Sequence, residues 1–221
     1  MKRVLKLGSR PSPLALRQAA EISRLFPHAE FQVKTYLTLG DKDRITPLSD
    51  VEGLDFFTRE LDEALLRDEI DLAVHSSKDL PEVTPCGLNV VFQTPSIAPN
   101  DCFISRVNLP LSGISKNSRI GTSSIRRKEQ LRKIRPDLLI VDVRGNVQER
   151  LALMDAGKFD GLIVAHAALI RLGLEHRITE VLNLNDFPTH PRQGSLSLVA
   201  KRERWQEVKS ILLEQGPGTG N

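Results

Sequence analysis

Arginines combined with hydroxyl side chains and helix-start signals recur along this chain of 221 residues. The segment Gly121-Thr122-Ser123-Ser124-Ile125-Arg126-Arg127 begins a predicted helix with hydroxyls followed by two arginines. Because a helix N-terminus is electropositive, cations in its first turn are locally unfavourable. Arg126 and Arg127 therefore indicate an anion site made of backbone N–H groups, hydroxyls and guanidinium groups. A solvated basic face is the alternative, and it explains the later basic residues of this helix better than the first pair.

A second cluster, Arg144-Gly145-Asn146-Val147-Gln148-Glu149-Arg150, has the same design. Asn146 can cap a helix, with Glu149 three residues later as in a capping box. The glycine before the cap lets a ligand approach the backbone closely. Arg144 and Arg150 should lie away from the buried face of this helix. Arginine suits planar, bidentate recognition of carboxylates, so several carboxylates on one ligand are the expected partner.

A single carboxylate stands among these cations. The segment His75-Ser76-Ser77-Lys78-Asp79-Leu80-Pro81 follows an apolar strand predicted at 72–74. Open α/β sheets bind ligands at the carboxyl ends of their strands. There Asp79 can accept a hydrogen bond from an N–H group, stabilise a neighbouring cation and, in a suitable environment, pass a proton. A polar turn ended by Pro81 is the alternative.

Other kinds of chemistry find little support in the sequence. Cys86 and Cys102 form no CxxC pair, and the five histidines show no metal-binding motif. There is no Walker loop, dinucleotide fingerprint or nucleophile elbow. The net charge of +3 is small for a nucleic-acid binder. No apolar run approaches the roughly 18 residues of a membrane span. We therefore expect a cytoplasmic, metal-free protein with no nucleic-acid or membrane partner.

The elements that must position these clusters alternate between strands and helices. Strands are predicted at 4–7, 31–37, 72–74, 88–92, 102–105, 120, 138–143, 161–165 and 195–200. Helices are predicted after Ser12-Pro13 (a typical N-cap and N1 pair), at 57–65, 124–134 and 146–156, and through Trp205. This alternation predicts an α/β fold with mixed, mostly parallel sheets flanked by helices. Irregular stretches at 94–100 and 183–194 interrupt it, and the length favours two domains.

Taken together, these segments resemble the hydroxymethylbilane synthase (porphobilinogen deaminase) family, and they occur in the family's order. The matching segments are 8–16, 75–81, 121–127, 144–147 and Arg171-Leu172-Gly173-Leu174. The resemblance runs from about Leu5 to about Val199. It implies two domains like those of type II periplasmic binding proteins, with an active-site cleft between them. Domain 1 would comprise residues 1–94 plus 195–221, and domain 2 would comprise residues 99–190.

The resemblance also implies a chemistry. The family deaminates porphobilinogen and joins four such units head to tail into hydroxymethylbilane, a linear tetrapyrrole of heme biosynthesis. In this mapping Asp79 and Lys78 are catalytic, and Asp79 holds pyrrole N–H groups and stabilises cationic intermediates. The residues implied to bind the cofactor are Ser76, Lys78, Asp79, Thr122, Ser124, Arg126, Arg127, Arg144, Gly145 and Gln193. Those implied to bind the substrate are Arg10, Ser12, Arg150 and Arg171.

The sequence also departs from the family pattern. The family's third domain, whose cysteine carries a covalent dipyrromethane primer, is expected to be absent, and neither Cys86 nor Cys102 corresponds to that cysteine. The loop at 49–56 is acidic where the family is basic, and the family's Pro-Gly-Gln-Gly turn reads Pro191-Arg192-Gln193-Gly194. We therefore expect a dipyrromethane-type primer to be bound without a covalent bond. Separately, we expect the protein to be a monomer.

Two functional hypotheses stay open at this point. The first is an active synthase acting on a carboxylated pyrrole. The second is a non-catalytic protein that binds or senses a linear tetrapyrrole or another polycarboxylate. Asp79 favours the synthase, because a protein that only binds anions has little need for a carboxylate among cations. A general two-lobed anion-binding protein fits the fold but explains Lys78-Asp79 poorly.

Overall fold

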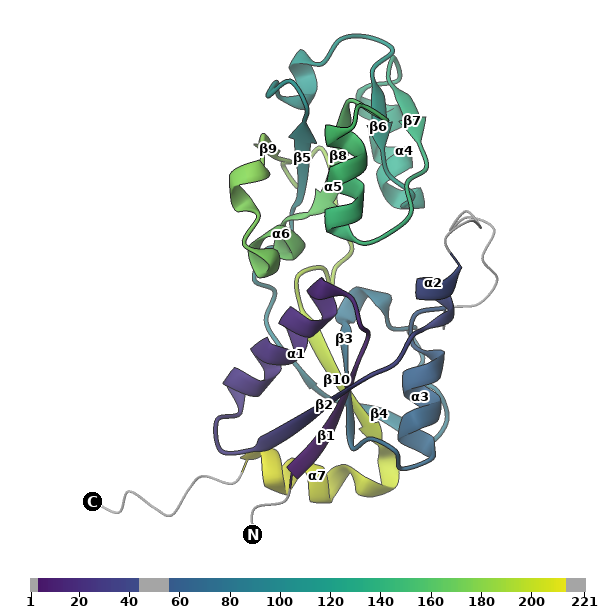
Figure 1. Cartoon of the computed structure of the whole chain (residues 1–221), viewed down its shortest axis with the longest axis vertical. Helices are drawn as coiled ribbons and strands as arrows, with labels where there is room; N and C mark the ends of the chain where they lie inside the picture. Colours follow the sequence, from purple (N-terminus) through teal and green to yellow (C-terminus); the bar gives the residue numbers. More distant parts are fainter. Residues whose placement is uncertain (1–3, 44–55, 214–221) are drawn as a thin grey trace, which may run out of the picture. The chain divides into compact units, whose positions relative to one another are not determined.

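The computed structural model describes residues 4–43 and 56–213. These residues form two compact units (Figure 1). Unit 1 contains residues 4–42, 56–95 and 195–213, and unit 2 contains residue 43 and residues 96–194. Within these ranges, no helix has the length and apolar character needed to cross a membrane. The acidic loop predicted at 49–56 lies outside the described residues except for Phe56.

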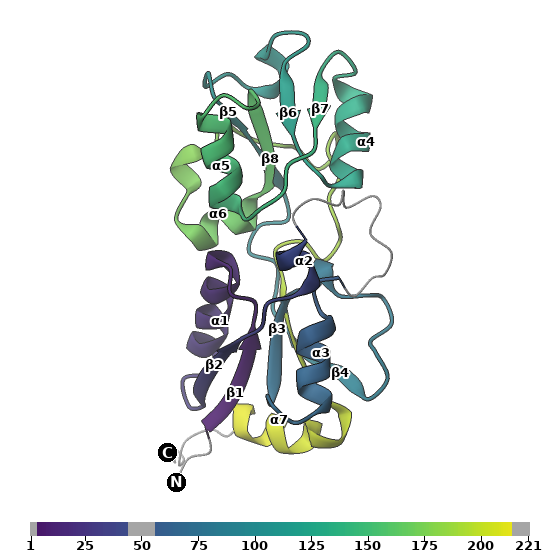
Figure 2. The same cartoon turned by 45° about the vertical axis from the view of Figure 1, so that its right-hand side comes forward.

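Unit 1 is built on a five-stranded sheet with the order β2-β1-β3-β10-β4, of which β2, β1, β3 and β4 are labelled in Figure 2. Its strands are β1 (Val4–Ser9), β2 (Glu30–Thr35), β3 (Leu72–Ser76), β4 (Leu88–Gln93) and β10 (Leu196–Lys201). β1 pairs in parallel with β2 and β3, whereas β10 runs antiparallel to β3 and β4. The helices of this unit are α1 (Pro13–Leu25), α2 (Leu39–Lys42), α3 (Arg59–Leu66) and α7 (Trp205–Leu213).

The core of unit 1 lies on both faces of this sheet. Successive strand residues point to opposite faces, so one strand can supply two clusters. Leu72 and Val74 of β3 pack in the cluster that includes residues of α1 and α7. Ala73, between them, packs in the cluster that includes Leu61 and Leu65 of α3. Helices therefore cover the two faces, as expected for strands that are apolar along their whole length.

Unit 2 repeats this arrangement with a second five-stranded sheet, β7-β6-β8-β5-β9. Its strands are β5 (Asp101–Ser105), β6 (Arg119–Gly121), β7 (Leu139–Val141), β8 (Gly161–Ala165) and β9 (Glu180–Val181). β6 is parallel to β7 and β8, and β5 is antiparallel to β8 and β9. The helices are α4 (Ile125–Ile134), α5 (Val147–Asp155) and α6 (His166–Leu172). In both units an antiparallel strand joins three parallel strands to an edge strand.

The predicted fold class is confirmed. Both sheets are mixed, each contains three adjacent parallel strands (β2-β1-β3 and β7-β6-β8), and both are flanked by helices. Several details differ from the sequence-based prediction. The elements α2 and β9 were not predicted, and the strands predicted at 31–37 and 138–143 are Glu30–Thr35 and Leu139–Val141 in the structure. β3 continues to Ser76, so His75 and Ser76 are strand residues rather than the start of a turn. Helix α6 was not predicted, since it follows β8 directly and Ala165 at its N-cap offers no capping side chain.

Candidate functional site

Two polar segments of unit 1 leave the same edge of its sheet. β1 and β3 are adjacent and parallel, so the residues that follow them meet at the carboxyl ends of the strands. Arg10 and Ser12 follow β1, and Lys78 and Asp79 lie in the 3-10 turn Ser77–Asp79 that follows β3. The residues of this unit that the sequence singles out therefore share one edge.

The turn after β3 is held in place by hydrogen bonds to neighbouring elements. The Ser77 N–H group donates to the Ser195 carbonyl at 3.0 Å, and the Ser77 and Ser197 hydroxyl oxygens lie 2.7 Å apart. The Gln18 amide of α1 donates to the Ser76 hydroxyl at 2.9 Å. Sequence reasoning missed Gln18, since a single glutamine in a helix carries no pattern. These contacts fix the backbone that carries Lys78 and Asp79.

Asp79 is half-buried at this edge. Its carboxylate makes no hydrogen bond or ion pair with any other residue in the described part of the chain. Ser12, by contrast, uses its hydroxyl to cap α1, accepting a hydrogen bond from the Ala15 N–H group at 3.2 Å. Asp79 therefore remains available to a ligand, whereas the hydroxyl oxygen of Ser12 already has a structural partner.

Arg10 is paired with a carboxylate that the sequence analysis did not single out. Its Nε donates to Asp41 Oδ2 at 3.1 Å and its Nη2 donates to Asp41 Oδ1, while its guanidinium carbon lies 4.5 Å from the centroid of the Phe57 ring. Burial acts to raise the pKa of Asp41, but hydrogen bonds from Arg10 and Thr38 outweigh it and lower this pKa below its ordinary value. Asp41 is therefore ionised when it holds Arg10.

The first turn of α4 has free backbone donors beside an exposed arginine. Ser124 is the N-cap residue, but its side chain makes no capping hydrogen bond. Arg126 is exposed, and its side chain has no partner among residues 4–43 and 56–213. The neighbouring Ser123 exchanges hydrogen bonds of 2.7 and 2.8 Å with the Val143 backbone, and Thr122 is buried. Arg126 and the N–H groups of this turn can thus receive an anion.

Arg127 and Gln193 lie in a buried network instead. Arg127 donates to both oxygens of Asp101, at 2.9 and 2.7 Å, and the side chain of Asp101 is only 2% exposed. The Gln193 amide donates to Asp101 Oδ1 and to the Pro99 and Asn100 carbonyls at 2.9 to 3.1 Å. Gln193 therefore ties the segment before β10 to residues 99–101, where β5 begins, and Arg127 ties α4 to the same Asp101. The sequence could not reveal Asp101 as their common partner.

The start of α5 has the predicted capping box. Asn146 accepts from the Glu149 N–H group at 2.9 Å, and Glu149 accepts from the Asn146 N–H group at 2.8 Å. Gly145 has a φ of +97°, and a Cβ there would lie 2.5 Å from Glu149 Oε2. The capping box thus requires this glycine whether or not a ligand approaches it.

Three further arginines donate to backbone carbonyls within unit 2. Arg150 Nε donates to the Gly145 carbonyl at 2.8 Å, and Arg144 Nη2 donates to the Asp43 carbonyl at 2.6 Å. Arg171 of α6 donates to the Gly194 carbonyl at 2.9 Å. Each of these bonds fixes the direction in which the guanidinium group points, because its five N–H donors lie in one rigid plane.

Neither cysteine is suited to anchor a pyrrole at this site. Cys102 is fully buried in β5, where burial and the nearby Asp101 raise its pKa to about 12. Cys86 is exposed but precedes β4, which runs parallel to β3, so it lies at the sheet edge opposite Asp79. Within the described ranges, no group of His, Cys, Asp or Glu residues is arranged to hold a metal ion.

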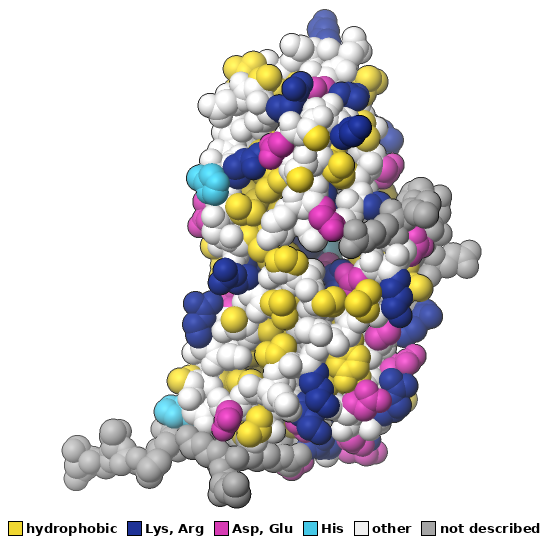
Figure 3. Space-filling view, in the orientation of Figure 1, with side chains coloured by type: hydrophobic (Ala, Val, Ile, Leu, Met, Phe, Trp, Pro, Cys, Tyr) yellow, Lys and Arg dark blue, Asp and Glu magenta, His cyan; other side chains and the backbone are white. Residues whose placement is uncertain are grey.

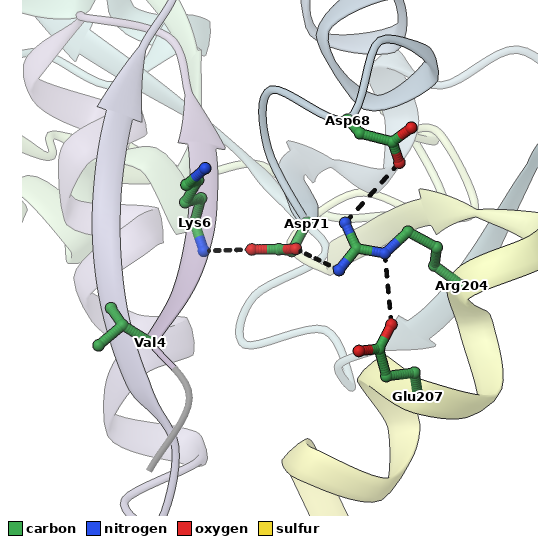
Figure 4. A pocket seen from close by; sticks show the side chains of 6 residues that line it. All are labelled: Val4, Lys6, Asp68, Asp71, Arg204 and Glu207. Carbon is green, nitrogen blue, oxygen red and sulfur yellow. Dashed lines mark hydrogen bonds and ion pairs between the residues drawn. The ribbon is translucent and has the colours of Figure 1, made fainter. Parts of the chain in front are cut away.

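An open hollow of about 590 Å³ lies at that opposite edge of unit 1 (Figure 4). Arg204 stands at its centre and pairs with Asp71 at 2.8 Å, Glu207 at 3.4 Å and Asp68 at 3.7 Å. Asp71 also accepts a hydrogen bond from the Lys6 N–H group at 2.7 Å. Because these charges satisfy one another, the hollow is better explained as the attachment of the C-terminal segment to the sheet than as a ligand site.

Basic and acidic side chains alternate on the face shown in Figure 3, in agreement with the small net charge. An anion site on this face would therefore need particular arginines, because the face carries no broad positive field.

Comparisons with known proteins agree with this structure. Residues 5–209 match the family model described as porphobilinogen deaminase, dipyromethane cofactor binding domain. Porphobilinogen deaminase of Chlorobium luteolum is 38% identical over 218 residues, covering 96% of this chain and 70% of that protein. Porphobilinogen deaminase of Syntrophobacter fumaroxidans is 38% identical over 214 residues, covering 95% of this chain and 69% of that protein.

Among solved structures, the methionine-binding protein MetQ is similar in fold, with a TM-score of 0.57 at 11% identity, covering 95% of this chain and 88% of that one. This likeness supports a two-domain fold of the periplasmic-binding-protein type. The family model covers most of the chain, and the two relatives match it over almost its whole length. The chain therefore belongs to the porphobilinogen deaminase family.

Proposed function

We propose that this protein catalyses the deaminative head-to-tail polymerisation of porphobilinogen to the linear tetrapyrrole hydroxymethylbilane, a step of heme biosynthesis. The observation that carries this proposal is the placement of Asp79. Its carboxylate has no partner among the described residues, and it lies beside Lys78 at the sheet edge that also carries Arg10. A carboxylate so placed can stabilise a cation that forms and disappears during each addition.

The reaction requires a negatively charged group that stabilises the positive charge that forms on a pyrrole. Loss of ammonia breaks the C–N bond of porphobilinogen and leaves a cationic azafulvene. The free α-carbon of the growing chain then attacks its methylene carbon, and the new C–C bond is completed when that α-carbon loses its proton. Asp79 accepts hydrogen bonds from pyrrole N–H groups and stabilises the positive charge in both steps. Lys78 binds carboxylates close to this centre.

Every pyrrole ring carries an acetate and a propionate, and the arginines bind these carboxylates. In unit 1, Arg10 binds the carboxylates of the incoming ring. In unit 2, Arg126 and the first turn of α4 bind those of the cofactor and growing chain, and Arg144, Arg150 and Arg171 add positive charge for the same carboxylates. Arg127 and Gln193 support this site through Asp101, and their direct contact with the cofactor stays a prediction.

A dipyrromethane cofactor fits these residues, because the uncapped start of α4 and Arg126 offer donors to its carboxylates. When bound, it supplies the free pyrrole α-carbon at which the chain begins. We expect this chain to hold it by non-covalent contacts, since Cys102 is buried and Cys86 lies at the far sheet edge. Intact-mass measurement of the purified protein tests this point. The mass of the unmodified chain is expected, and an added dipyrromethane mass would contradict it.

Replacement of Asp79 by asparagine tests the proposed function. Asp79→Asn keeps the size of the side chain but removes its charge, so porphobilinogen consumption should fall by about a thousandfold or more. The far-UV circular dichroism should remain that of the wild type, because Asp79 has no structural partner among the described residues. Asp186→Asn, at an exposed position, is the control and should retain full activity. Equal consumption by wild type and Asp79→Asn would contradict the role given to Asp79.

The monomeric state and cytoplasmic location expected from the sequence stay predictions. Sedimentation equilibrium of the purified protein and cell fractionation would test them.

A further inference from the structure

The Arg10 guanidinium contacts Asp41 and Phe57 of unit 1, and Gly40 leaves room for the Phe57 ring. Asp41 accepts two hydrogen bonds from one edge of the guanidinium, and the guanidinium carbon lies over the Phe57 ring. Gly40 donates its N–H group to the Phe56 carbonyl at 2.9 Å. A Cβ at Gly40 would lie only 2.1 Å from Phe57 Cε1. The glycine therefore leaves the space that the ring needs, and the guanidinium is held along one edge by Asp41 and lies over the Phe57 ring.

Asp41 is itself held in place. Its Oδ2 accepts hydrogen bonds from the Thr38 N–H group at 3.2 Å and from the Thr38 hydroxyl at 2.8 Å. These bonds tie Asp41 to the residue that precedes the short helix α2. The side chain of Asp41 is 14% exposed and that of Arg10 is 25% exposed. The carboxylate is thus oriented by its own turn, and it can in turn orient a partner that remains accessible.

One nitrogen of the Arg10 guanidinium, Nη1, remains available to a ligand. Nε and Nη2 are engaged by Asp41, whereas Nη1 has no hydrogen-bond partner in the described part of the chain. A planar guanidinium cannot turn one nitrogen without turning the others, so its held edge decides where Nη1 points. We propose that Asp41 is a positioning residue, which orients Arg10 so that its Nη1 side receives a carboxylate of the pyrrole substrate. This inference rests on the proposed function, in which Arg10 binds the incoming ring.

Steady-state kinetics with porphobilinogen test this role. Asp41→Asn keeps the size of the side chain but loses the charge and one acceptor oxygen. Its KM should rise by about tenfold or more while kcat changes less than about threefold, because Asp41 touches no reacting atom. Asp41→Glu keeps the charge but moves the carboxylate by one methylene group, so its KM should also rise. In the double variant Arg10→Lys with Asp41→Asn, KM should equal that of Arg10→Lys alone.

Asp137→Asn is the matched control. Asp137 accepts two hydrogen bonds of 2.8 Å from Arg135 in unit 2, so this variant breaks a similar pair elsewhere and should keep the wild-type KM and kcat. If circular dichroism shows that Asp41→Asn does not fold, the kinetics of Asp41→Glu are used to test the inference instead. An unchanged KM in the folded variant, or additive effects in the double variant, would overturn the inference. If the wild type consumes no porphobilinogen, the proposed function fails, and dissociation constants for porphobilinogen replace KM with the same expected ratios.

Discussion

His75 lies near the end of β3 with only 4% of its surface exposed, and its Nε2 has no hydrogen-bond partner among the residues that the structure describes. Burial and the positive charge of Arg10 lower its pKa from 6.5 to about 4. The folded protein therefore keeps this imidazole neutral, whereas the unfolded chain protonates it below about pH 6.5. A folded-state pKa below the unfolded value means that stability is complete above pH 6.5 and is lost as the pH falls towards 4.

Because the buried imidazole resists protonation, the protein should lose stability as the pH falls. Between pH 7 and pH 4, the free energy of unfolding should fall by about 3 kcal/mol through this residue alone. His75→Gln cannot be protonated, so its stability should fall less over the same interval. Urea denaturation at several pH values measures both proteins. Parallel pH profiles for the wild type and His75→Gln would show that His75 does not carry this effect.

The sequence predicts only those site residues that follow a pattern. Asp79 and Arg10 were found because each follows a strand, where α/β sheets place ligands. Asp41 was missed because its partner Arg10 lies 31 positions away, and no local rule joins them. Arg126 and Arg127 could not be distinguished from each other in the sequence, because both are arginines in the first turn of one helix. In the structure Arg126 is exposed, whereas Arg127 is paired with the buried Asp101.

Among the elements, helix starts were predictable where a side chain provides a cap. Ser12 caps α1 and Asn146 forms the capping box of α5, so both helices begin where the sequence indicates. α6 has no such residue and was missed, although Gly173 ends it with a φ of +67°. Strand positions followed from apolar runs, but their order did not. That order depends on β10, which inserts between β3 and β4 from far along the chain.

The segment that leads into β10 makes Gly194 a sensitive position. Gly194 has a φ of +88°, and a Cβ there would lie 2.2 Å from Ser96 Oγ and 2.7 Å from the Ala98 carbonyl oxygen. Gly194→Ala should therefore lower the free energy of unfolding by about 3 kcal/mol or more, from backbone strain and overpacking together. Gly173→Ala is the control, because it has a similar φ with no atom within 4 Å, and it should cost about 1 kcal/mol. Equal losses in urea denaturation would contradict the packing argument.

At the scale of the whole molecule, the chain crosses from unit 1 to unit 2 and returns. The returning segment supplies β10 to the sheet of unit 1, and the ion pairs of Arg204 with Asp68 and Asp71 join the turn before α7 to residues near the start of β3. In the proposed function, the two units carry different parts of the chemistry. Unit 1 provides Asp79 and Arg10, which is held by Asp41, and unit 2 provides Arg126 at an uncapped helix start.

The central claim is that this protein polymerises porphobilinogen, and a time course of consumption with product detection tests it most directly. Purified protein, with and without added linear tetrapyrrole as primer, is incubated with porphobilinogen, and the substrate, ammonia and hydroxymethylbilane are measured. We expect four porphobilinogen molecules and four ammonia molecules for each tetrapyrrole released. Binding of the pyrrole with no consumption under either condition would contradict the claim and would support the non-catalytic hypothesis.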